Sequence, residues 1–463
     1  MSKDYNSRYI FLITLVATLG GLLFGYDTAV ISGAEKSIQA FLITSQGLST
    51  LIHGATVSSA LIGCIIGGAI SGFFSNRLGR RNTLLLAALL FFVSALGSGF
   101  PETLFFAKGQ PSIGLLLMFN FYRVIGGIGV GLASAVSPMY ISEIAPASIR
   151  GRLVSFNQFA IIFGMLVVYF VNWGIAKGQS LEWINSVGWR YMFASEAIPA
   201  ALFGFLLLFV PETPRYLALT HRDEKALSVL TKVNGTKDKA LQILNEIKQT
   251  VGQKVQAKIF SYGKKVIIIG ILLSVFQQFV GINVALYYAP RIFESMGAAK
   301  DASMLQTIIM GFVNVIFTVV AILTVDKWGR KPLLITGSIG MAIGMFAISA
   351  LSFNNIIGIS TLVFIIIYTA SFMMSWGPIC WVLISEIFPN KIRGQAVAIA
   401  VAAQWTANYL ISSTYPAMME FSGGMTYGFY GLMAVLSALF VWKMVPETKG
   451  KSLEEMESLW HKG

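Results

Sequence analysis

Asp27, Arg123 and Glu196 are among the few ionisable residues inside long apolar runs of this chain. A charge at the centre of a bilayer costs roughly 2.5–3.5 kcal/mol on insertion scales, so such residues usually pair or line a wet cavity. Asp27 and Arg123 have opposite charges and are natural partners. An acid that alternates between pairing with an arginine and carrying a proton can couple proton movement to a conformational change. The alternative is a static ion pair, which is how we interpret Glu196 with nearby Arg190.

Amides and aromatic residues in the same runs form a second group that could bind an uncharged polyol. Amide side chains both donate and accept hydrogen bonds, and the C–H faces of a sugar pack on aromatic rings. Buried amides also join helices to one another, so plain packing is the alternative. The amides are Gln158, Gln277, Gln278, Asn283, Asn314, Gln404 and Asn408, and the aromatic residues are Phe24, Tyr287, Trp376, Trp381 and Trp405. The runs hold no cationic cluster, which disfavours phosphorylated or dicarboxylate substrates.

The apolar runs are long enough to cross a membrane. Hydrophobic residues make up 55% of the chain and charged residues only 12%. A span needs about 20 apolar residues, and runs this continuous must be helices, because barrel strands alternate apolar and polar. We predict an all-α membrane protein whose twelve transmembrane helices lie near 9–32, 52–75, 83–99, 113–137, 153–173, 190–210, 265–289, 303–325, 332–351, 357–382, 394–414 and 427–446.

Lysine and arginine predict the orientation of these helices. The segment 211–265 holds eleven basic residues against five acidic ones, and the short basic loops fall on the same side of the membrane. Positive residues stay in the cytoplasm, so we expect a multi-pass protein of the cell inner membrane with both termini cytoplasmic. The net charge of +13 therefore reports orientation and does not indicate nucleic-acid binding. The two cysteines and three histidines lack metal-binding spacing, and no catalytic constellation is visible, so we expect no metal, no cofactor and no enzyme.

Internal repeats indicate two similar halves. Three segments recur at nearly the same separation, namely 141–151 as 384–394, 76–81 as 326–331, and 211–213 as 446–448. A membrane chain made of two similar halves can close around a central cavity and open it to one side at a time. The expected domains are an N-terminal six-helix bundle (1–210), a cytoplasmic linker with short amphipathic helices (211–264), a C-terminal six-helix bundle (265–446) and a cytoplasmic tail (447–463). A break in the tenth helix is expected at Trp376-Gly377-Pro378, because proline removes a backbone donor.

Several motifs resemble the sugar-porter branch of the major facilitator superfamily over nearly the whole chain. The loop signatures are Asn76-Arg77-Leu78-Gly79-Arg80-Arg81 and Asp326-Lys327-Trp328-Gly329-Arg330-Lys331, and the helix-ending markers are Pro211-Glu212-Thr213-Pro214-Arg215 and Pro446-Glu447-Thr448-Lys449-Gly450. Gln277-Gln278-Phe279-Val280-Gly281-Ile282-Asn283 is similar to the family's sugar-binding seventh helix. Within the family, the segments 20–30, 155–160 and 402–405 most resemble bacterial D-xylose–proton symporters. The resemblance implies the major facilitator fold and import of D-xylose or a related monosaccharide with protons.

The resemblance also implies roles for individual residues. Asp27 would be the proton site and Arg123 its partner. Sugar contacts would come from Gln158, Gln277, Gln278, Asn283, Trp381 and Gln404, with Phe24, Gly377 and Trp405 closing the pocket and Tyr287 nearby. A cytoplasmic gate of ion pairs would comprise Arg81, Glu143, Arg150, Arg152, Glu212, Arg330, Glu386, Arg393 and Glu447. The alternative for these loop charges is a solvated basic rim, in which an exposed pair contributes at most about 1 kcal/mol.

One departure from the family pattern leaves the sugar open. Met165 stands two turns after Gln158 on the same face, where the xylose symporters have a glutamine, so it joins the candidate pocket. A glucose or hexose symporter and an uncoupled sugar facilitator are therefore alternatives, although facilitative relatives commonly have an amide at the position of Asp27. A non-transporting sugar sensor is a different class, which the short segment after Pro446-Glu447-Thr448 disfavours. We expect the protein to work as a monomer in the bilayer.

Overall fold

The computed structural model describes residues 5–103, 105–146, 149–251, 258–295, 297, 299–356, 358–389, 392–449 and 460 of the 463-residue chain. Every regular element in these ranges is a helix, as predicted. Helices suit the long apolar runs because their backbone donors and acceptors are satisfied within the segment.

The N-terminal half ends at the close of α9. Its first span, α1, continues through a π-helical turn and a 3₁₀ turn, and its sixth span is divided into α8 and α9 around Ser195 and Glu196. The elements are α1 (Ser7–Ile38), η1 (Gln39–Ile43), η2 (Thr44–Gln46), α2 (Thr50–Val57), α3 (Ser59–Leu78), α4 (Arg80–Gly99), α5 (Ile113–Ile144), α6 (Arg150–Ala176), α7 (Leu181–Trp183), η3 (Ile184–Gly188), α8 (Trp189–Ala194) and α9 (Ala197–Leu207).

Three helices follow before the second half: α10 (Pro214–Leu219), α11 (Asp223–Asn234) and α12 (Lys237–Val251). Pro214 occupies the first turn of α10, where its missing N–H is not needed, and Gly235 ends α11 in the left-handed conformation. The backbone N–H of Asn6 donates to Val233 O at 2.8 Å, which ties the start of α1 to α11. We call the end of the molecule that carries α10–α12 the linker end, and the opposite end the far end.

The C-terminal half begins at α13. Its elements are α13 (Lys264–Phe279), α14 (Ile282–Tyr287), α15 (Ala289–Ser295), α16 (Lys300–Trp328), α17 (Arg330–Phe353), α18 (Ile359–Met373), α19 (Trp376–Ile387), α20 (Arg393–Phe421) and α21 (Gly423–Met444). The expected break of the tenth span is present, since α18 stops at Met373 and α19 starts at Trp376.

The seventh predicted span is also broken, which the sequence analysis did not anticipate. Gly281 separates α13 from α14 with φ +88°, a left-handed value that favours glycine. A Cβ at this position would lie 2.8 Å from the Tyr430 ring of α21. The break therefore turns the chain between Gln278 and Asn283, which brings these two amides together.

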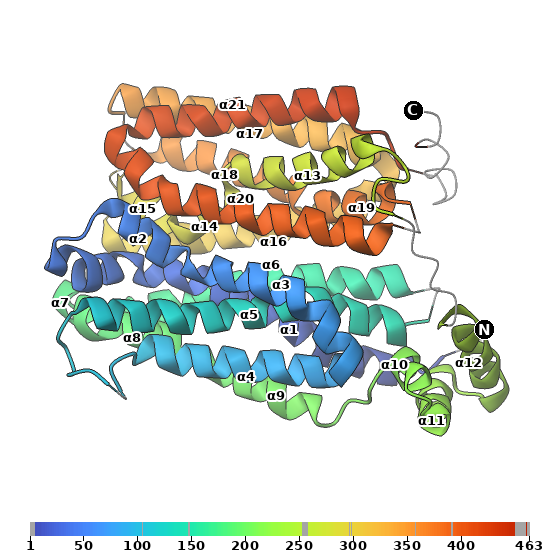
Figure 1. Cartoon of the computed structure of the whole chain (residues 1–463). Helices are drawn as coiled ribbons and strands as arrows, with labels where there is room; N and C mark the ends of the chain where they lie inside the picture. The colour runs from blue at the N-terminus through green and yellow to red at the C-terminus, as the bar shows by residue number, and fades with distance from the viewer. Residues whose placement is uncertain are drawn as a thin grey trace.

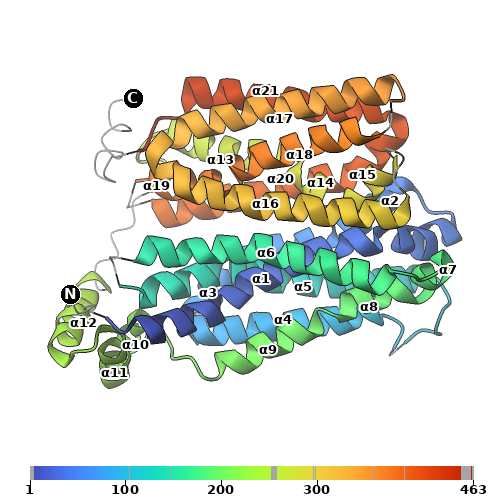
Figure 2. The ribbon, with the colours of Figure 1, turned by 180° about the vertical axis from the view of Figure 1, so that it is seen from behind.

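The two halves lie side by side as two layers of roughly antiparallel helices (Figures 1 and 2). Contacts between them run through α2 and α3 against α20, α6 against α16, and α1 against α14 and α15. The first turn of α1, the last turn of α21 and the linker helices all lie at the linker end (Figure 1). The interface between the layers is where the predicted site residues of both halves can meet.

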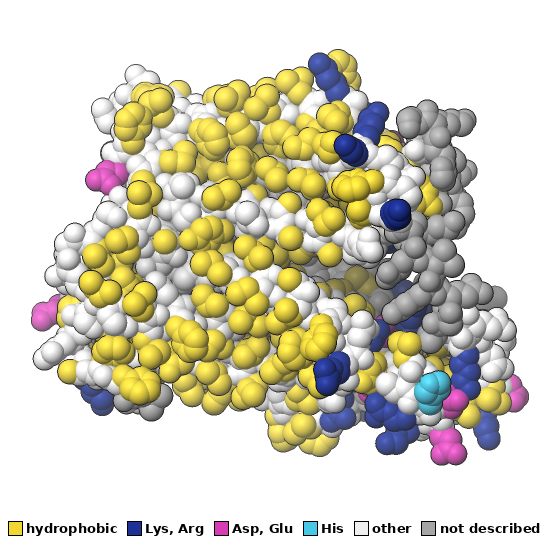
Figure 3. Space-filling view, in the orientation of Figure 1, with side chains coloured by type: hydrophobic (Ala, Val, Ile, Leu, Met, Phe, Trp, Pro, Cys, Tyr) yellow, Lys and Arg dark blue, Asp and Glu magenta, His cyan; other side chains and the backbone are white. Residues whose placement is uncertain are grey.

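The surface has the pattern of a membrane protein. Figure 3 shows apolar side chains over the middle of the visible face, and lysine and arginine gathered toward the linker end. Ten helical segments among the described residues are long and apolar enough to cross a membrane. The other two predicted spans correspond to the divided α8 and α9 and to the 29-residue α20.

Candidate functional site

Asp27 and Arg123 form the buried ion pair that their sequence positions predict. Arg123 of α5 donates from Nη1 to Asp27 Oδ1 at 2.7 Å and from Nη2 to the Asp27 carbonyl at 3.1 Å. The two side chains are 0% and 1% exposed. The second carboxylate oxygen of Asp27 and the Nε of Arg123 have no hydrogen-bond partner among the described residues. The unpaired oxygen of this buried carboxyl group is therefore the atom on which a proton would bind.

Glu196 lies in the same region, and its expected pairing with Arg190 is wrong. Arg190 instead donates to Glu102 at 2.7 Å, because its side chain reaches the loop after α4. Glu196 is buried, neither of its carboxylate oxygens has a hydrogen-bond partner in the described structure, and it interacts electrostatically with Asp27 and Arg123. Two carboxyl groups therefore face one arginine in a dry environment.

Four of the predicted sugar-binding amides, Gln277, Gln278, Asn283 and Gln404, form one connected chain of hydrogen bonds in the C-terminal half. Gln277 of α13 donates to the carbonyls of Trp376 at 3.0 Å and Gly377 at 3.3 Å. Gln404 of α20 donates to Gln277 Oε1, and Gln278 donates to the same atom at 3.2 Å. Asn283 donates to Gln278 Oε1 at 2.5 Å. Gln404 Oε1 and Trp405 Nε1 are buried without partners among the described residues, so the cluster holds an unused acceptor and an unused donor.

Aromatic side chains from both halves border the amide cluster. The rings of Phe24 on α1 and Trp405 on α20 have centroids 5.7 Å apart, so this contact crosses the interface. Tyr287 on α14 accepts a hydrogen bond from Asn408 Nδ2 at 3.3 Å. Trp376 donates from Nε1 to Ser338 Oγ at 2.8 Å, which anchors the broken tenth span to α17.

The remaining pocket candidates occupy different environments. Gln158 on α6 and Trp381 on α19 are both half-buried. Met165, which lies two turns after Gln158 on the same face of α6, is only 7% exposed. Its backbone N would lie 3.1 Å from a Cβ built on Gly25, which shows how closely α6 approaches α1 next to Asp27.

A cluster of charges at the linker end joins the helices of the N-terminal half. Arg80 donates to both oxygens of Glu143, at 2.8 and 2.9 Å, and Thr213 donates to Glu143 at 2.6 Å. The backbone N–H groups of Arg80 and Arg81 donate to Glu212 at 3.1 Å. Burial raises the pKa of Glu212, against the lowering effect of these N–H donors.

The same arrangement recurs in the C-terminal half, as the sequence repeat predicts. Arg330 donates to Glu386 at 3.0 and 3.3 Å, Thr448 donates to Glu386 at 2.6 Å, and the backbone of Arg330 and Lys331 donates to Glu447 at 3.1 and 2.9 Å. Burial acts to raise the pKa of Glu447, but backbone donors outweigh it and the pKa is lowered. Arg80 and Thr213 thus belong to a repeated motif, but the predicted gate did not include them. Alignment of the two loop repeats matches Arg80 with Arg330, so Arg80 could have been found from the sequence.

The other predicted gate arginines make local contacts instead. The Arg81 side chain donates to the carbonyls of Leu207 at 2.9 Å and Leu208 at 3.0 Å, because it lies over the end of α9. Arg150 reaches the carbonyl of Ala145, and Arg393 that of Phe388. Arg152 is exposed. The ion pairs between described residues at the linker end therefore stay within each half.

At the far end the two halves are joined. Lys36 and Glu35 of α1 pair with Glu294 and Arg291 of α15. A Cβ on Gly54 of α2 would lie 1.9 Å from the backbone oxygen of Ser413 on α20, so these helices pack backbone to backbone. The structure is closed at the far end.

Comparison with known proteins gives the same picture. A family model described as "Sugar (and other) transporter" matches residues 13–460. The chain is 56% identical to the D-xylose-proton symporter of Escherichia coli (strain K12), over 99% of this chain and 97% of that protein. It is 38% identical to the glucose facilitated diffusion protein of Zymomonas mobilis, over 99% of both chains. The chain belongs to the sugar transporter family, and it is a multi-pass membrane transporter.

Two solved structures of the xylose transporter XylE from E. coli confirm the major facilitator fold. The inward open form superposes with a TM-score of 0.89 at 55% identity, covering 97% of this chain and all of that chain. The form bound to 6-bromo-6-deoxy-D-glucose gives 0.83 at 55% identity, covering 98% of this chain and all of that chain.

Proposed function

We propose that the protein is a proton-coupled symporter that imports D-xylose or a related monosaccharide by alternating access. The observation that carries the proposal is the dry Asp27–Arg123 pair lying in the same interface as a cluster of neutral amides and aromatic rings. Family membership and the symporter names among the relatives support it. A neutral sugar needs donors and acceptors, whereas coupling needs one group that changes charge, and this chain has both.

In this proposal, Asp27, Arg123 and Glu196 of the N-terminal half carry out the proton step. When Asp27 takes up a proton, its charge no longer holds Arg123, so the balance between the two conformations changes. Glu196 interacts with the same arginine, so it provides a second carboxyl group that Arg123 can contact when it leaves Asp27.

The sugar step falls to the cluster around Gln277. Gln277 bonds to Gln278, Gln404 and two backbone carbonyls. Hydroxyl groups of a sugar would replace some of these bonds and use the free atoms Gln404 Oε1 and Trp405 Nε1. Phe24 and Trp405, which meet across the interface, would cover the ring and link sugar binding to the approach of the halves.

The membrane arrangement follows from charge and fold. Basic residues gather at the linker end, so that end faces the cytoplasm of the cell inner membrane, with both termini on that side. The units 1–210 and 265–446 would move against each other about the site, joined by the linker 211–264, with 447–463 as a tail. The repeated Arg–Glu clusters at the linker end would close the cytoplasmic side in the other conformation. A single chain surrounds the site, so we propose a monomer in the bilayer.

The test is uptake of a panel of labelled pentoses and hexoses into sealed proteoliposomes, with and without an acidic exterior. We expect accumulation of xylose or a close relative above the outside concentration only with the proton gradient. Uptake that merely equilibrates, whatever the gradient, would instead establish a facilitator of the kind named among the relatives.

The same panel tests the pocket through Met165. Met165→Gln adds a donor and an acceptor on the face of α6 that also carries Gln158, so we expect the ratio of xylose to glucose uptake to rise severalfold. Phe163→Leu, on the exposed face of α6, is the control. An unchanged ratio would remove Met165 from the pocket and leave the sugar preference to other residues.

A further inference from the structure

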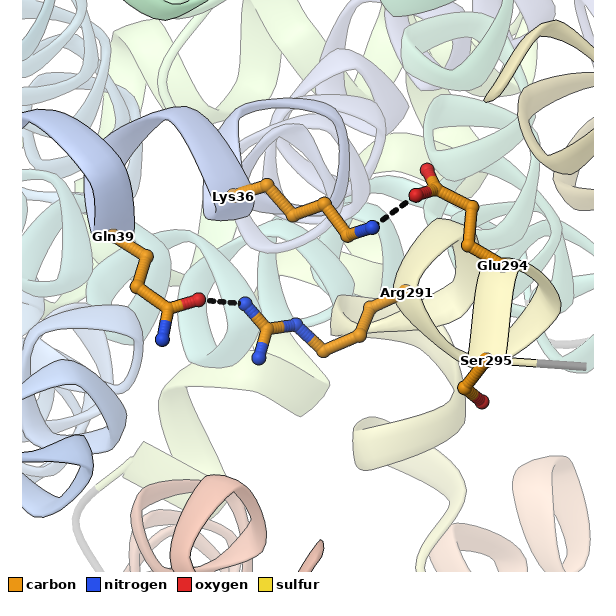
Figure 4. Close-up of a pocket in the computed structure, with 5 residues that line it drawn as sticks. All are labelled: Lys36, Gln39, Arg291, Glu294 and Ser295. Carbon is orange, nitrogen blue, oxygen red and sulfur yellow. Dashed lines mark hydrogen bonds and ion pairs between the residues drawn. The ribbon is translucent and has the colours of Figure 1, made fainter. Parts of the chain in front are cut away.

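Two ion pairs at the far end join α1 to α15 across the interface, and Figure 4 shows the one between Lys36 and Glu294. Lys36 pairs with Glu294. Arg291 lies with Nη2 2.7 Å from Oε1 of Glu35 and with Nε 2.9 Å from Oε2, and it also donates to Gln39. All of these contacts connect one half to the other. None of these residues belongs to the amide cluster or to the Asp27 pair.

The inner pair is buried and held in place from within its own half. Glu35 is 1% exposed, and its Oε1 also accepts from His53 Nε2 of α2 at 2.5 Å, where His53 is 0% exposed. A carboxylate accepts only, so the Nε2–H tautomer of His53 is the donor. His53 is thus a positioning residue that aims Glu35 at Arg291. A buried carboxylate without its cation is strongly disfavoured, so the closed far end requires Arg291.

The pairs border a cavity of ≈ 540 Å³ lined by Lys36, Gln39, Arg291, Glu294 and Ser295 (Figure 4). Water in this space can hydrate the charges once they separate. The outer pair is already partly exposed, at 43% for Lys36 and 25% for Glu294. Separation of the halves therefore replaces ion pairs by hydrated charges. The buried Glu35–Arg291 pair loses more electrostatic stabilisation in this step than the exposed Lys36–Glu294 pair.

We propose that these residues form an outer latch, comprising Lys36–Glu294 and Glu35–Arg291 with His53 behind Glu35, which holds the extracellular side closed. The proposal rests on the proposed alternating access and adds a residue-level control to it. The latch favours the conformation that faces the cytoplasm. It therefore sets how readily the empty transporter opens to sugar outside the cell.

The test measures the distance between nitroxide labels on cysteines at Gln179 and Ser360, which are exposed near the far end of each half. The native Cys64 and Cys380 are buried, so they stay unlabelled. Open and closed molecules should give a long and a short distance between the labels. Arg291→Ala and Glu35→Gln should each raise the ratio of the long-distance population to the short-distance population at least about tenfold. Lys36→Glu should raise it about 2- to 5-fold, and Lys36→Glu combined with Glu294→Lys should restore the original ratio.

Lys248→Glu is the matched control, because the Lys248–Asp223 pair has similar exposure, at 45% and 42%, but lies within the linker helices. It should leave the distances unchanged. Unchanged distances in both Arg291→Ala and Glu35→Gln would overturn the latch, and so would a charge swap that fails to restore the ratio. These distances need no transport, so a protein that carries no sugar would defeat the proposed function while the latch is judged separately.

Discussion

At the scale of single residues, the proton site depends on how few partners the carboxyl groups have. Among the described residues, Asp27 uses one carboxylate oxygen on Arg123 and has no hydrogen-bond partner for the other, and Glu196 has none for either oxygen. Sequence reasoning found Asp27 and Arg123 because charges in apolar runs need partners. It assigned Glu196 wrongly because nearness along the chain does not fix the direction of a long arginine side chain. Arg190 lies six residues from Glu196 but reaches Glu102 instead.

Glu196→Gln tests whether this second acid takes part in coupling. Glu196→Gln replaces a buried carboxyl group near Arg123 with an amide that cannot carry a proton. We expect sugar uptake driven by an acidic exterior to fall severalfold and its pH profile to differ from that of wild type, while sugar counterflow continues. Uptake measured across external pH in proteoliposomes checks this.

Glu182→Gln, on the exposed surface of α7, serves as the control and should keep the original profile. If Glu196→Gln and Glu182→Gln give superimposable profiles, Glu196 is only a structural residue.

At the scale of elements, the two broken spans position the sugar site. Pro378 made the break before α19 predictable, because proline cannot donate to the preceding turn. The break at Gly281 was not predictable, since glycine is also common in unbroken membrane helices. Its left-handed conformation, and the Tyr430 ring beside it, became evident only in the structure.

Gly281→Ala should therefore damage both stability and binding. A left-handed alanine costs about 1–2 kcal/mol, and its Cβ would meet Tyr430. We expect a lower melting temperature in detergent and weaker sugar binding, because Gln278 and Asn283 lose their relative positions. Thermal unfolding with and without sugar measures both effects.

Gly174→Ala, on α6 with open space around it, is the matched control and should change neither quantity. Equal melting temperatures for Gly281→Ala and Gly174→Ala would show that the break does not need glycine.

At the scale of the whole molecule, the sequence repeat predicts more than any single motif. The helical class, the paired halves and the matching Arg–Glu clusters all follow from hydrophobic runs and repeated loops. The latch residues Glu35, His53 and Arg291 were not predictable, because they come from three helices and have no repeated or spaced pattern. The conformation of the structure was also not predictable from the sequence, because alternating access requires the same chain to adopt at least two conformations.

The most direct test of the account compares wild type with Asp27→Asn in sealed proteoliposomes. The asparagine keeps the size of the side chain but cannot carry the coupling proton. We predict that Asp27→Asn loses accumulation driven by an acidic exterior, whereas exchange of labelled for unlabelled sugar across the membrane persists. If Asp27→Asn still accumulates sugar against its concentration gradient as wild type does, the proton is carried elsewhere and the account is contradicted.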